Sequence, residues 1–374
     1  MKKELSAAEL GCILEEIKGM SDSKVDKIYQ PNKDELLIQL HKTGIGKKVI
    51  RIKGKFIHLT EHKPENPMTP FGFCTYLRKK LGNSILREIR QVGSERVAEM
   101  IFETKQGKLN LIVELFGAGN IILVDENNII MSPMNIQIFK DRAVRPGKEY
   151  QITRKKYNIF EIKEKELADL LKESKQESTV KALALDLGLG GIYSEELCII
   201  KKIDKNKKPS SLSGQDVKKI FSGLKDMVSR KSEPQIVMKG KDVVDITPFG
   251  LEKYKDFESK KQESYNKALD SIITAHAVSV DKAEKQKIET KELERIRKSI
   301  EIQEKNIKKQ RKDAEENQRK GEIIYEKYSV VKEILDELIK AREKHSWKEI
   351  KEKLKGHKVV KEINEKEGKI VVEI

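Results

Sequence analysis

Apolar residues recur at two spacings along this chain, and the spacings divide it into regions. Near the N-terminus, four of them follow the 3.6-residue period of a helix: Leu10, Ile13, Leu14 and Ile17. Ser6 with Glu9 three residues later is a capping-box pattern, which predicts a helix over 7–18. After Gly19, short segments with strand-type apolar content alternate with turn signals.

The predicted strands cover residues 25–29, 36–40, 49–52, 56–59, 85–92, 97–102, 109–116, 121–124 and 129–131. A second helix is predicted from Thr69-Pro70 through Leu81, between the fourth strand and the fifth. The later strands have the pattern of a meander, in which Gly117, Gly119 and Asn120 close a hairpin. The first 150 residues are therefore predicted to form an α+β domain.

Two apolar helical segments between Val180 and Leu197 flank Gly188-Leu189-Gly190. This arrangement is typical of a helix-hairpin-helix unit, because the glycines allow a tight turn whose backbone N–H groups can point at a phosphate. A plain helix connection is the alternative. Lysines follow closely, starting with Lys201 and Lys202, and they favour contact with a nucleic-acid backbone through Gly188, Gly190 and these two side chains.

From residue 261 onward, Gly and Pro nearly vanish and charged residues dominate. Positions spaced at threes and fours from Leu293 to Leu338 are mostly apolar, which predicts an unbroken left-handed coiled-coil seam. Its middle is weaker, because Gln303, Gln310, Asn317 and Gly321 bury little apolar surface. Such a seam needs a partner, so we expect either a returning helix or a homodimer. Residues 346–374 predict a short helix and two β segments, and the chain ends on Val-Val-Glu-Ile, which indicates a piece of a larger protein.

Charge points to a polyanionic partner. The 374 residues include 77 Lys and Arg against 61 Asp and Glu, a net charge of +16, which favours nucleic acid. A basic protein bound to a membrane surface is the rival interpretation. However, the sequence has no run of about 18 apolar residues and no signal-peptide pattern, so a cytoplasmic protein is expected.

Metal and cofactor chemistry is not indicated. The three cysteines, Cys12, Cys74 and Cys198, are far apart and odd in number, which fits neither a disulfide framework nor a zinc knuckle. The six histidines form no ligand-spaced cluster with them. We expect no metal, no cofactor and no catalytic dyad.

The segment from Gly82 to Asp125 is the most distinctive part of the sequence. It reads GNSILREIRQVGSERVAEMIF over residues 82–102 and FGAGNIILVD over residues 116–125. With Ser6 to Glu9 upstream and Arg145 to Tyr150 downstream, it resembles the N-terminal part of the NFACT family, the ribosome quality-control factors that include NEMF and RqcH. The resemblance covers essentially the whole chain.

The resemblance implies four regions. These are an α/β domain similar to formamidopyrimidine glycosylases over 1–175, completed by 232–260; an inserted helix-hairpin-helix domain over 176–231; a coiled-coil arm over 261–343; and the start of a middle domain over 344–374. A returning coil and an NFACT-R domain are absent from this sequence.

It also implies binding to a large ribosomal subunit obstructed by peptidyl-tRNA, through ribosomal RNA and tRNA. Several members recruit a charged tRNA, often alanyl-tRNA, for untemplated tailing of the stalled chain. Ribosomal RNA would make the peptide bond, so no enzymatic activity is expected from this protein.

The family motif combines an acidic residue early in the first helix with an acidic residue and Arg after a hairpin strand. Glu9, Glu95 and Arg96 occupy these positions, with Glu where the family has Asp. Arg96 can bind phosphate or stack on a base, and a carboxylate can accept from RNA. In a plainer interpretation, Glu9 only caps its helix. Glu95 and Arg96, as neighbours in a strand, would point apart unless the turn at Gly93-Ser94 distorts it.

Two other function classes stay open. A DNA-repair glycosylase would need an N-terminal proline nucleophile and usually a zinc finger, whereas position 2 is Lys. An adhesin or coiled-coil scaffold fits the label "fibronectin-binding" attached to parts of the family. It fits the charge of +16 and the lack of an export signal less well.

Overall fold

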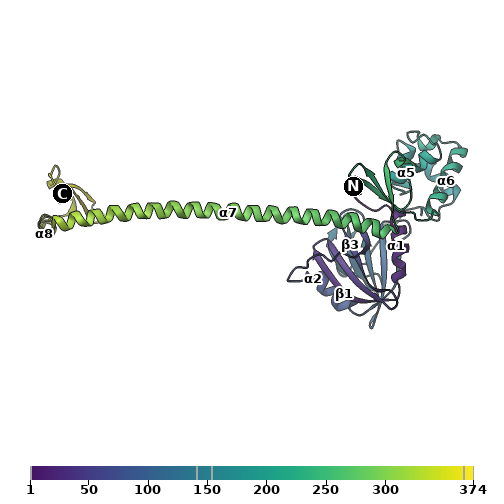
Figure 1. The fold of residues 1–374 in the computed structure, drawn as a ribbon, viewed down its shortest axis with the longest axis horizontal. Helices are drawn as coiled ribbons and strands as arrows, with labels where there is room; N and C mark the ends of the chain where they lie inside the picture. The colour runs from purple at the N-terminus through teal and green to yellow at the C-terminus, as the bar shows by residue number, and fades with distance from the viewer. Residues whose placement is uncertain (1, 140–141, 153–154, 365–366, 374) are drawn as a thin grey trace. The chain divides into compact units, whose positions relative to one another are not determined.

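The computed structural model describes residues 2–139, 142–152, 155–364 and 367–373, with the side chains of 276–289 left aside. The chain divides into two compact units, Met1–Ser279 and Val280–Ile374, and each is described by itself. Figure 1 shows the elements of both. Most of the predicted features fall in the first unit.

Helix α1, Ala7–Ile17, begins at the predicted capping box. The Ser6 Oγ accepts from the Glu9 backbone N, and the Glu9 carboxylate accepts from the Ser6 backbone N. Leu10, Ile13 and Ile17 are buried on one face of this helix. A 3₁₀ turn, Lys18–Met20, then leads into the first strand. The prediction of this helix from local pattern is confirmed.

A nine-stranded antiparallel sheet forms the body of the first unit, in the order β4-β3-β2-β1-β5-β6-β7-β8-β9. Its strands are β1 Ser23–Asn32, β2 Glu35–Lys42, β3 Gly46–Lys53, β4 Phe56–Thr60, β5 Ile85–Gln91, β6 Val97–Thr104, β7 Gly107–Glu114, β8 Asn120–Val124 and β9 Ile130–Pro133. Two meanders, β1 to β4 and β5 to β9, join where β1 pairs with β5 through Ser23 and Lys24. Helix α2, Gly72–Leu81, connects them and packs with α1 into the sheet's core. The predicted α+β class and the meander are confirmed.

A helical region follows, after the short ribbon of β10 Gln137–Ile138 and β11 Ala143–Val144. Its elements are α3 Glu164–Glu173, α4 Thr179–Lys181, a π-helical turn Ala182–Asp186, α5 Gly191–Ile200, η3 Pro209–Ser211 and α6 Gly214–Val228. These helices have a hydrophobic core of their own, which includes Leu183, Leu197 and Leu224. Two helical segments thus flank the Gly188–Gly190 turn, where both glycines have positive φ.

The chain then returns to the sheet region through a second, three-stranded sheet. Its strands are β12 Gln235–Lys239, β13 Asp242–Thr247 and β14 Glu258–Lys261, with η4 Glu252–Tyr254 between the last two. Ile236 and Ile246 belong to the same core as the large sheet. Residues 235–261 therefore pack with the first domain although the helical region separates them from it in sequence.

The long helix α7, Tyr265–Glu326, begins later than the predicted arm, because residue 261 ends β14. Lys327 alone separates α7 from α8, Tyr328–Lys344, and helical hydrogen bonds from Lys327 to Ile323 and from Val331 to Lys327 continue across it. Further along, α8 buries Leu338 against α9, Trp347–Lys353, and the hairpin of β15 Val360–Asn364 and β16 Lys369–Val372, whereas the seam residue Leu335 is exposed. A coiled-coil partner or homodimer stays a prediction.

Apolar seam residues of α7 such as Leu293, Ile300 and Ile307 are about half exposed. Even so, no helix within the described residues has a window long and apolar enough to cross a membrane. Charged residues fill most positions between those of the stripe, which keeps the mean hydropathy of the helix low.

The first turns of α7 are fixed to the first unit by side-chain caps. The Glu16 carboxylate, near the end of α1, accepts from the backbone N of Tyr265 at 2.7 Å and of Asn266 at 3.0 Å. It also accepts from the Asn266 side chain at 2.6 Å. One turn later, Asp270 accepts from the Thr60 hydroxyl of β4 at 2.6 Å. A carboxylate at a helix N-terminus satisfies free N–H groups and favours the helix dipole.

We expect Glu16→Ala to loosen this helix start. Losing a charged acceptor for three donors should cost about 2 kcal/mol, roughly a 30-fold rise in local opening. Hydrogen exchange of a peptide covering 264–274 would measure the effect. Glu15→Ala is the matched control, because Glu15 is exposed and pairs only with Lys18 among the ion pairs of the described residues, so its effect should stay below about 0.5 kcal/mol. Equal exchange in both variants would contradict the role of Glu16.

Candidate functional site

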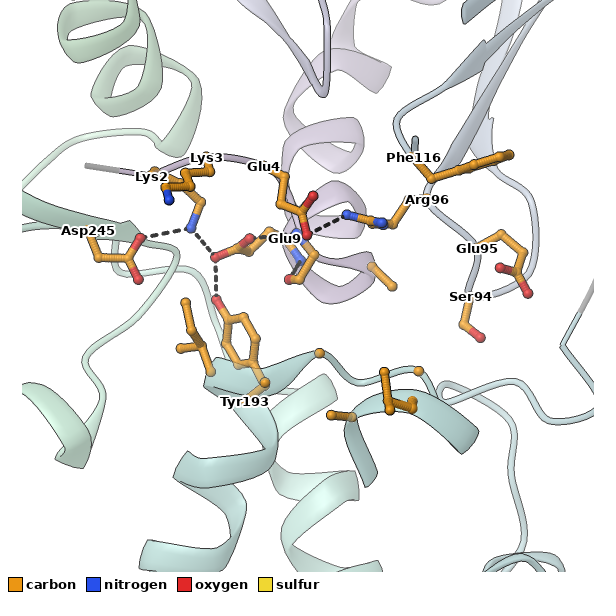
Figure 2. Close-up of a pocket in the computed structure, with 18 of the residues that line it drawn as sticks. Lys2, Lys3, Glu4, Glu9, Ser94, Glu95, Arg96, Phe116, Tyr193 and Asp245 are labelled. Carbon is orange, nitrogen blue, oxygen red and sulfur yellow. Dashed lines mark hydrogen bonds and ion pairs between the residues drawn. The ribbon is translucent and has the colours of Figure 1, made fainter. Parts of the chain in front are cut away.

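A cleft of about 680 Å³ lies where the N-terminal segment, the β5–β6 turn, the Gly188–Gly190 turn and β13 come together. Figure 2 shows it with many of the side chains that line it. Five of the seven residues singled out in the sequence line this cleft: Glu9, Glu95, Arg96, Gly188 and Gly190. Tertiary structure therefore brings together positions that lie up to 181 residues apart in the chain.

Glu95 and Arg96 both line the cleft, and neither lies in a strand. β5 ends at Gln91 and β6 starts at Val97, and Gly93 in the turn between them has φ +56°. The alternation that would have pointed the two side chains apart therefore does not apply. The Glu95 Oε1 accepts from the backbone N of Lys155 at 2.6 Å, which joins the turn to the segment that leads into the helical region.

Arg96 is the cation of the motif that a ligand can reach. Its Nη1 lies 2.8 Å from the Glu4 Oε1, and its side chain is 28% exposed. Burial alone would raise the pKa of Glu4, but hydrogen bonds from Lys55 and Arg96 lower it. Since this ion pair is exposed to solvent, a phosphate can compete for the guanidinium at small cost.

Glu9 lies beneath the cleft surface and is 1% exposed. Its Oε1 accepts from the Lys2 Nζ at 2.5 Å and from the Tyr193 hydroxyl at 2.8 Å. Its Oε2 accepts from the Ser6 backbone N at 2.8 Å. Lys2 also donates to Asp245 of β13 at 3.0 Å, and Figure 2 shows Lys2 and Tyr193 converging on Glu9. The helix cap and the buried ionic cluster together occupy both carboxylate oxygens.

The protonation states in this cluster follow from its charges. Burial would lower the pKa of the Lys2 ammonium, but Glu9 and Asp245 raise it above its ordinary value. Burial and the Glu9 charge raise the pKa of Tyr193 well above its usual range, so its hydroxyl stays a donor. A Lys2 side chain held as an ammonium cannot serve as an amine nucleophile.

The Gly188–Gly190 turn is built differently from a phosphate cradle. The backbone N–H groups of Leu189 and Gly190 donate to the carbonyls of Leu183 and Ala184, the helical segment before the turn. Gly188 has φ +88°, and a Cβ there would meet the Lys155 side chain at 2.4 Å. The missing Cβ therefore makes room for Lys155, whose Nζ donates to the Leu185 carbonyl at 3.0 Å.

Lys201 and Lys202 are not among the residues that line the cleft, and their contact with a nucleic-acid backbone stays a prediction. They follow the end of α5, whereas the glycine turn precedes its start. The Lys201 Nζ pairs with Asp226 at 2.9 Å, so part of its charge is neutralised within the helical region. The lysines near the turn in sequence are thus separated from it by the length of a ten-residue helix.

No sequence pattern predicted that several other residues would line the cleft. These are Lys2, Lys3, Glu4, Phe116, Lys155, Tyr193 and Asp245. An aromatic in an apolar helix or a lysine near a terminus has no distinctive spacing. Phe116 is 37% exposed. Figure 2 shows it near Arg96. Among the residues that the structure describes, no group of three His, Cys, Asp or Glu side chains could hold a metal ion.

Comparison with known proteins shows which family this chain belongs to. The model of the NFACT N-terminal and middle domains matches residues 7–368, nearly the whole chain. The chain belongs to the NFACT family. The motif positions in the cleft are thus those of an NFACT protein, and the resemblance inferred from residues 82–125 is confirmed.

Curated relatives carry names from ribosome quality control. The archaeal Rqc2 homolog aRqcH of Methanocaldococcus jannaschii is 34% identical over all of this chain, which spans 58% of that relative's length. The ribosome quality control complex subunit 2 of Saccharomyces cerevisiae is 30% identical over 41% of this NFACT chain and 14% of its own length.

Among solved structures, the N-terminal part of the fibronectin/fibrinogen-binding protein from Streptococcus suis matches with a TM-score of 0.59 and 22% identity. The match covers 73% of this NFACT chain and all of that structure. The fibrinogen binding protein from Staphylococcus aureus gives a TM-score of 0.58 at 20% identity, over 71% and 97%. At such identities the likeness concerns the fold alone.

We expect Lys2→Met to destabilise this NFACT chain, because Glu9 and Asp245 would remain buried without their shared cation. The cost of leaving buried charges unpaired is about 3–5 kcal/mol, which should lower the melting temperature by roughly 10 °C in thermal unfolding followed by circular dichroism. Lys3→Met is the control, since the neighbouring lysine is exposed and should change stability by less than about 0.5 kcal/mol. A Lys2 variant as stable as the Lys3 variant would refute the buried cluster.

Proposed function

We propose that this NFACT protein acts in ribosome quality control, by binding large ribosomal subunits that still hold peptidyl-tRNA. In this proposal the cleft engages tRNA, and the protein supports untemplated tailing in which ribosomal RNA makes the peptide bond. The protein itself then needs no cofactor and no catalytic group. The observation that carries the proposal is the meeting of Glu9, Glu95 and Arg96 at one cleft.

The chemistry of the cleft suits RNA. Arg96 can form a bidentate pair with a phosphate, and the exposed Lys3 adds a second positive charge on the same N-terminal segment. The exposed ring of Phe116 beside Arg96 offers a surface for an unpaired base, and single-stranded RNA is commonly bound by such stacking. The net charge of +16 would speed the encounter with ribosomal RNA and make binding depend on salt.

The two alternative functions have less support. A glycosylase of this fold would use the amine of an N-terminal proline, whereas position 2 is Lys, whose side chain is bonded to Glu9 and Asp245. An adhesin role rests on what the two structural neighbours are described as binding, at 20–22% identity. We therefore consider both functions less well supported than ribosome quality control.

Co-sedimentation with purified large subunits tests the proposal first. We expect binding that favours subunits carrying peptidyl-tRNA and that persists as salt is raised, because specific contacts add to the electrostatic attraction. Binding that is equal with and without peptidyl-tRNA, and that disappears uniformly with salt, would reduce the protein to a general polyanion binder. Subunits without peptidyl-tRNA serve as the matched control.

Arg96→Ala should weaken tRNA binding far more than Lys312→Ala on α7. Each phosphate contact that is lost lowers the slope of log affinity against log salt by about 0.7–0.9, and Arg96 should account for one such contact. Lys312 is an exposed helix cation near Glu316 and is expected to leave affinity and slope nearly unchanged. Fluorescence anisotropy with labelled tRNA across a salt series measures both quantities. Equal losses in the two variants would refute the site.

A further inference from the structure

The acidic residue of the motif lies at the floor of the cleft, with both carboxylate oxygens bonded within the protein. Glu9 is 1% exposed, and its two oxygens accept three hydrogen bonds, from Lys2, Tyr193 and the Ser6 backbone. A carboxylate with both oxygens engaged below the surface would have to give up buried bonds to contact RNA, at a cost of several kcal/mol. Its effect on binding must therefore pass through the residues that it holds.

The Glu9–Tyr193 bond connects the two sides of the cleft. Glu9 belongs to α1, whose apolar face packs in the core of the large sheet, and Gln91 ties the Glu95–Arg96 turn to α1 by donating to the Ala7 and Glu95 carbonyls. Tyr193 belongs to α5, directly after the Gly188–Gly190 turn, and packs in the core of the helical region, which α1 enters only through Ala7. One 2.8 Å bond thus adds a polar link between the two sides beside this apolar contact.

A second link joins the same two sides. The backbone N of Lys155 donates a hydrogen bond to the Glu95 carboxylate at 2.6 Å, and its Nζ donates to the Leu185 carbonyl at 3.0 Å. Because this bridge remains, loss of the Tyr193 hydroxyl would let the helical wall of the cleft move more, but the two walls would not separate. The cleft would remain, but its two sides would be held less firmly.

We propose that Tyr193 is a positioning residue of the RNA site, which fixes the distance between the cleft walls through Glu9 and does not touch RNA. This inference rests on the proposed function. Tyr193 is 1% exposed, so RNA cannot reach its ring. A ligand that contacts both walls needs them held to within about 0.5 Å, and a rigid hydrogen bond at the floor supplies that constraint. Lys2 supports the same arrangement by tying Glu9 to Asp245.

Tyr193→Phe tests the proposal, because it keeps the ring and removes only the hydroxyl. We expect affinity for purified tRNA to fall about five- to tenfold in fluorescence anisotropy, while the salt slope stays that of the wild type, since no cation is lost. Hydrogen exchange in a peptide covering 188–200 should become faster. The unchanged slope separates a positioning residue from a phosphate contact such as Arg96.

Tyr150→Phe is the matched control. Tyr150 is also buried and donates to a glutamate, Glu114, at 2.8 Å, but it lies away from the cleft. Its removal should cost comparable stability and leave tRNA affinity within twofold of the wild type. Melting curves of both variants show whether each is folded at the assay temperature.

Wild-type affinity in Tyr193→Phe would overturn the proposal, as would equal affinity losses in the Tyr193 and Tyr150 variants. A reduced salt slope in Tyr193→Phe would overturn it as well, because RNA contacts would then have changed in number. Failure of the proposed function has a different signature: the wild type would show no preference for obstructed subunits, and Arg96→Ala would bind tRNA as well as the wild type does.

Discussion

The buried Glu9 carboxylate is the constraint on which the cleft depends. A charge in the interior is tolerated only where donors surround it, and here the donors come from the N-terminal segment, the start of α1 and α5. Lys2 in turn needs Asp245, so β13 is drawn into the same cluster. Four segments must therefore fold together before any one of these charges is satisfied, which makes the cleft floor a cooperative structure.

Helix α1 extends this constraint to the long helix. Its first turn holds Glu9 at the cleft, and its last turn holds Glu16, which caps the start of α7. The first residue of α7, Tyr265, is fully buried and donates its hydroxyl to Ile246, next to Asp245 on β13. The RNA site that we propose and the beginning of the arm thus share one helix of eleven residues.

A positive charge in this protein can bind a particular ligand only where no carboxylate within the protein holds it firmly. The sequence has an excess of 16 positive charges, yet many individual cations are paired, as Lys2 and Lys201 are. In the cleft, Arg96 is held by an exposed carboxylate that a phosphate can replace. In the function that we propose, net charge would supply a general attraction to RNA, whereas the accessibility of a few cations would decide where RNA binds.

Local pattern by itself determined the capping box at Glu9, the meander and the glycine turns, because each depends on residues only a few positions apart. The family motif likewise identified Arg96 from a short stretch of sequence. Only the tertiary structure decided that Tyr193 meets Glu9, 184 residues away, and that Gly188 makes room for Lys155. Such contacts arise when separate cores pack, and no periodicity records them.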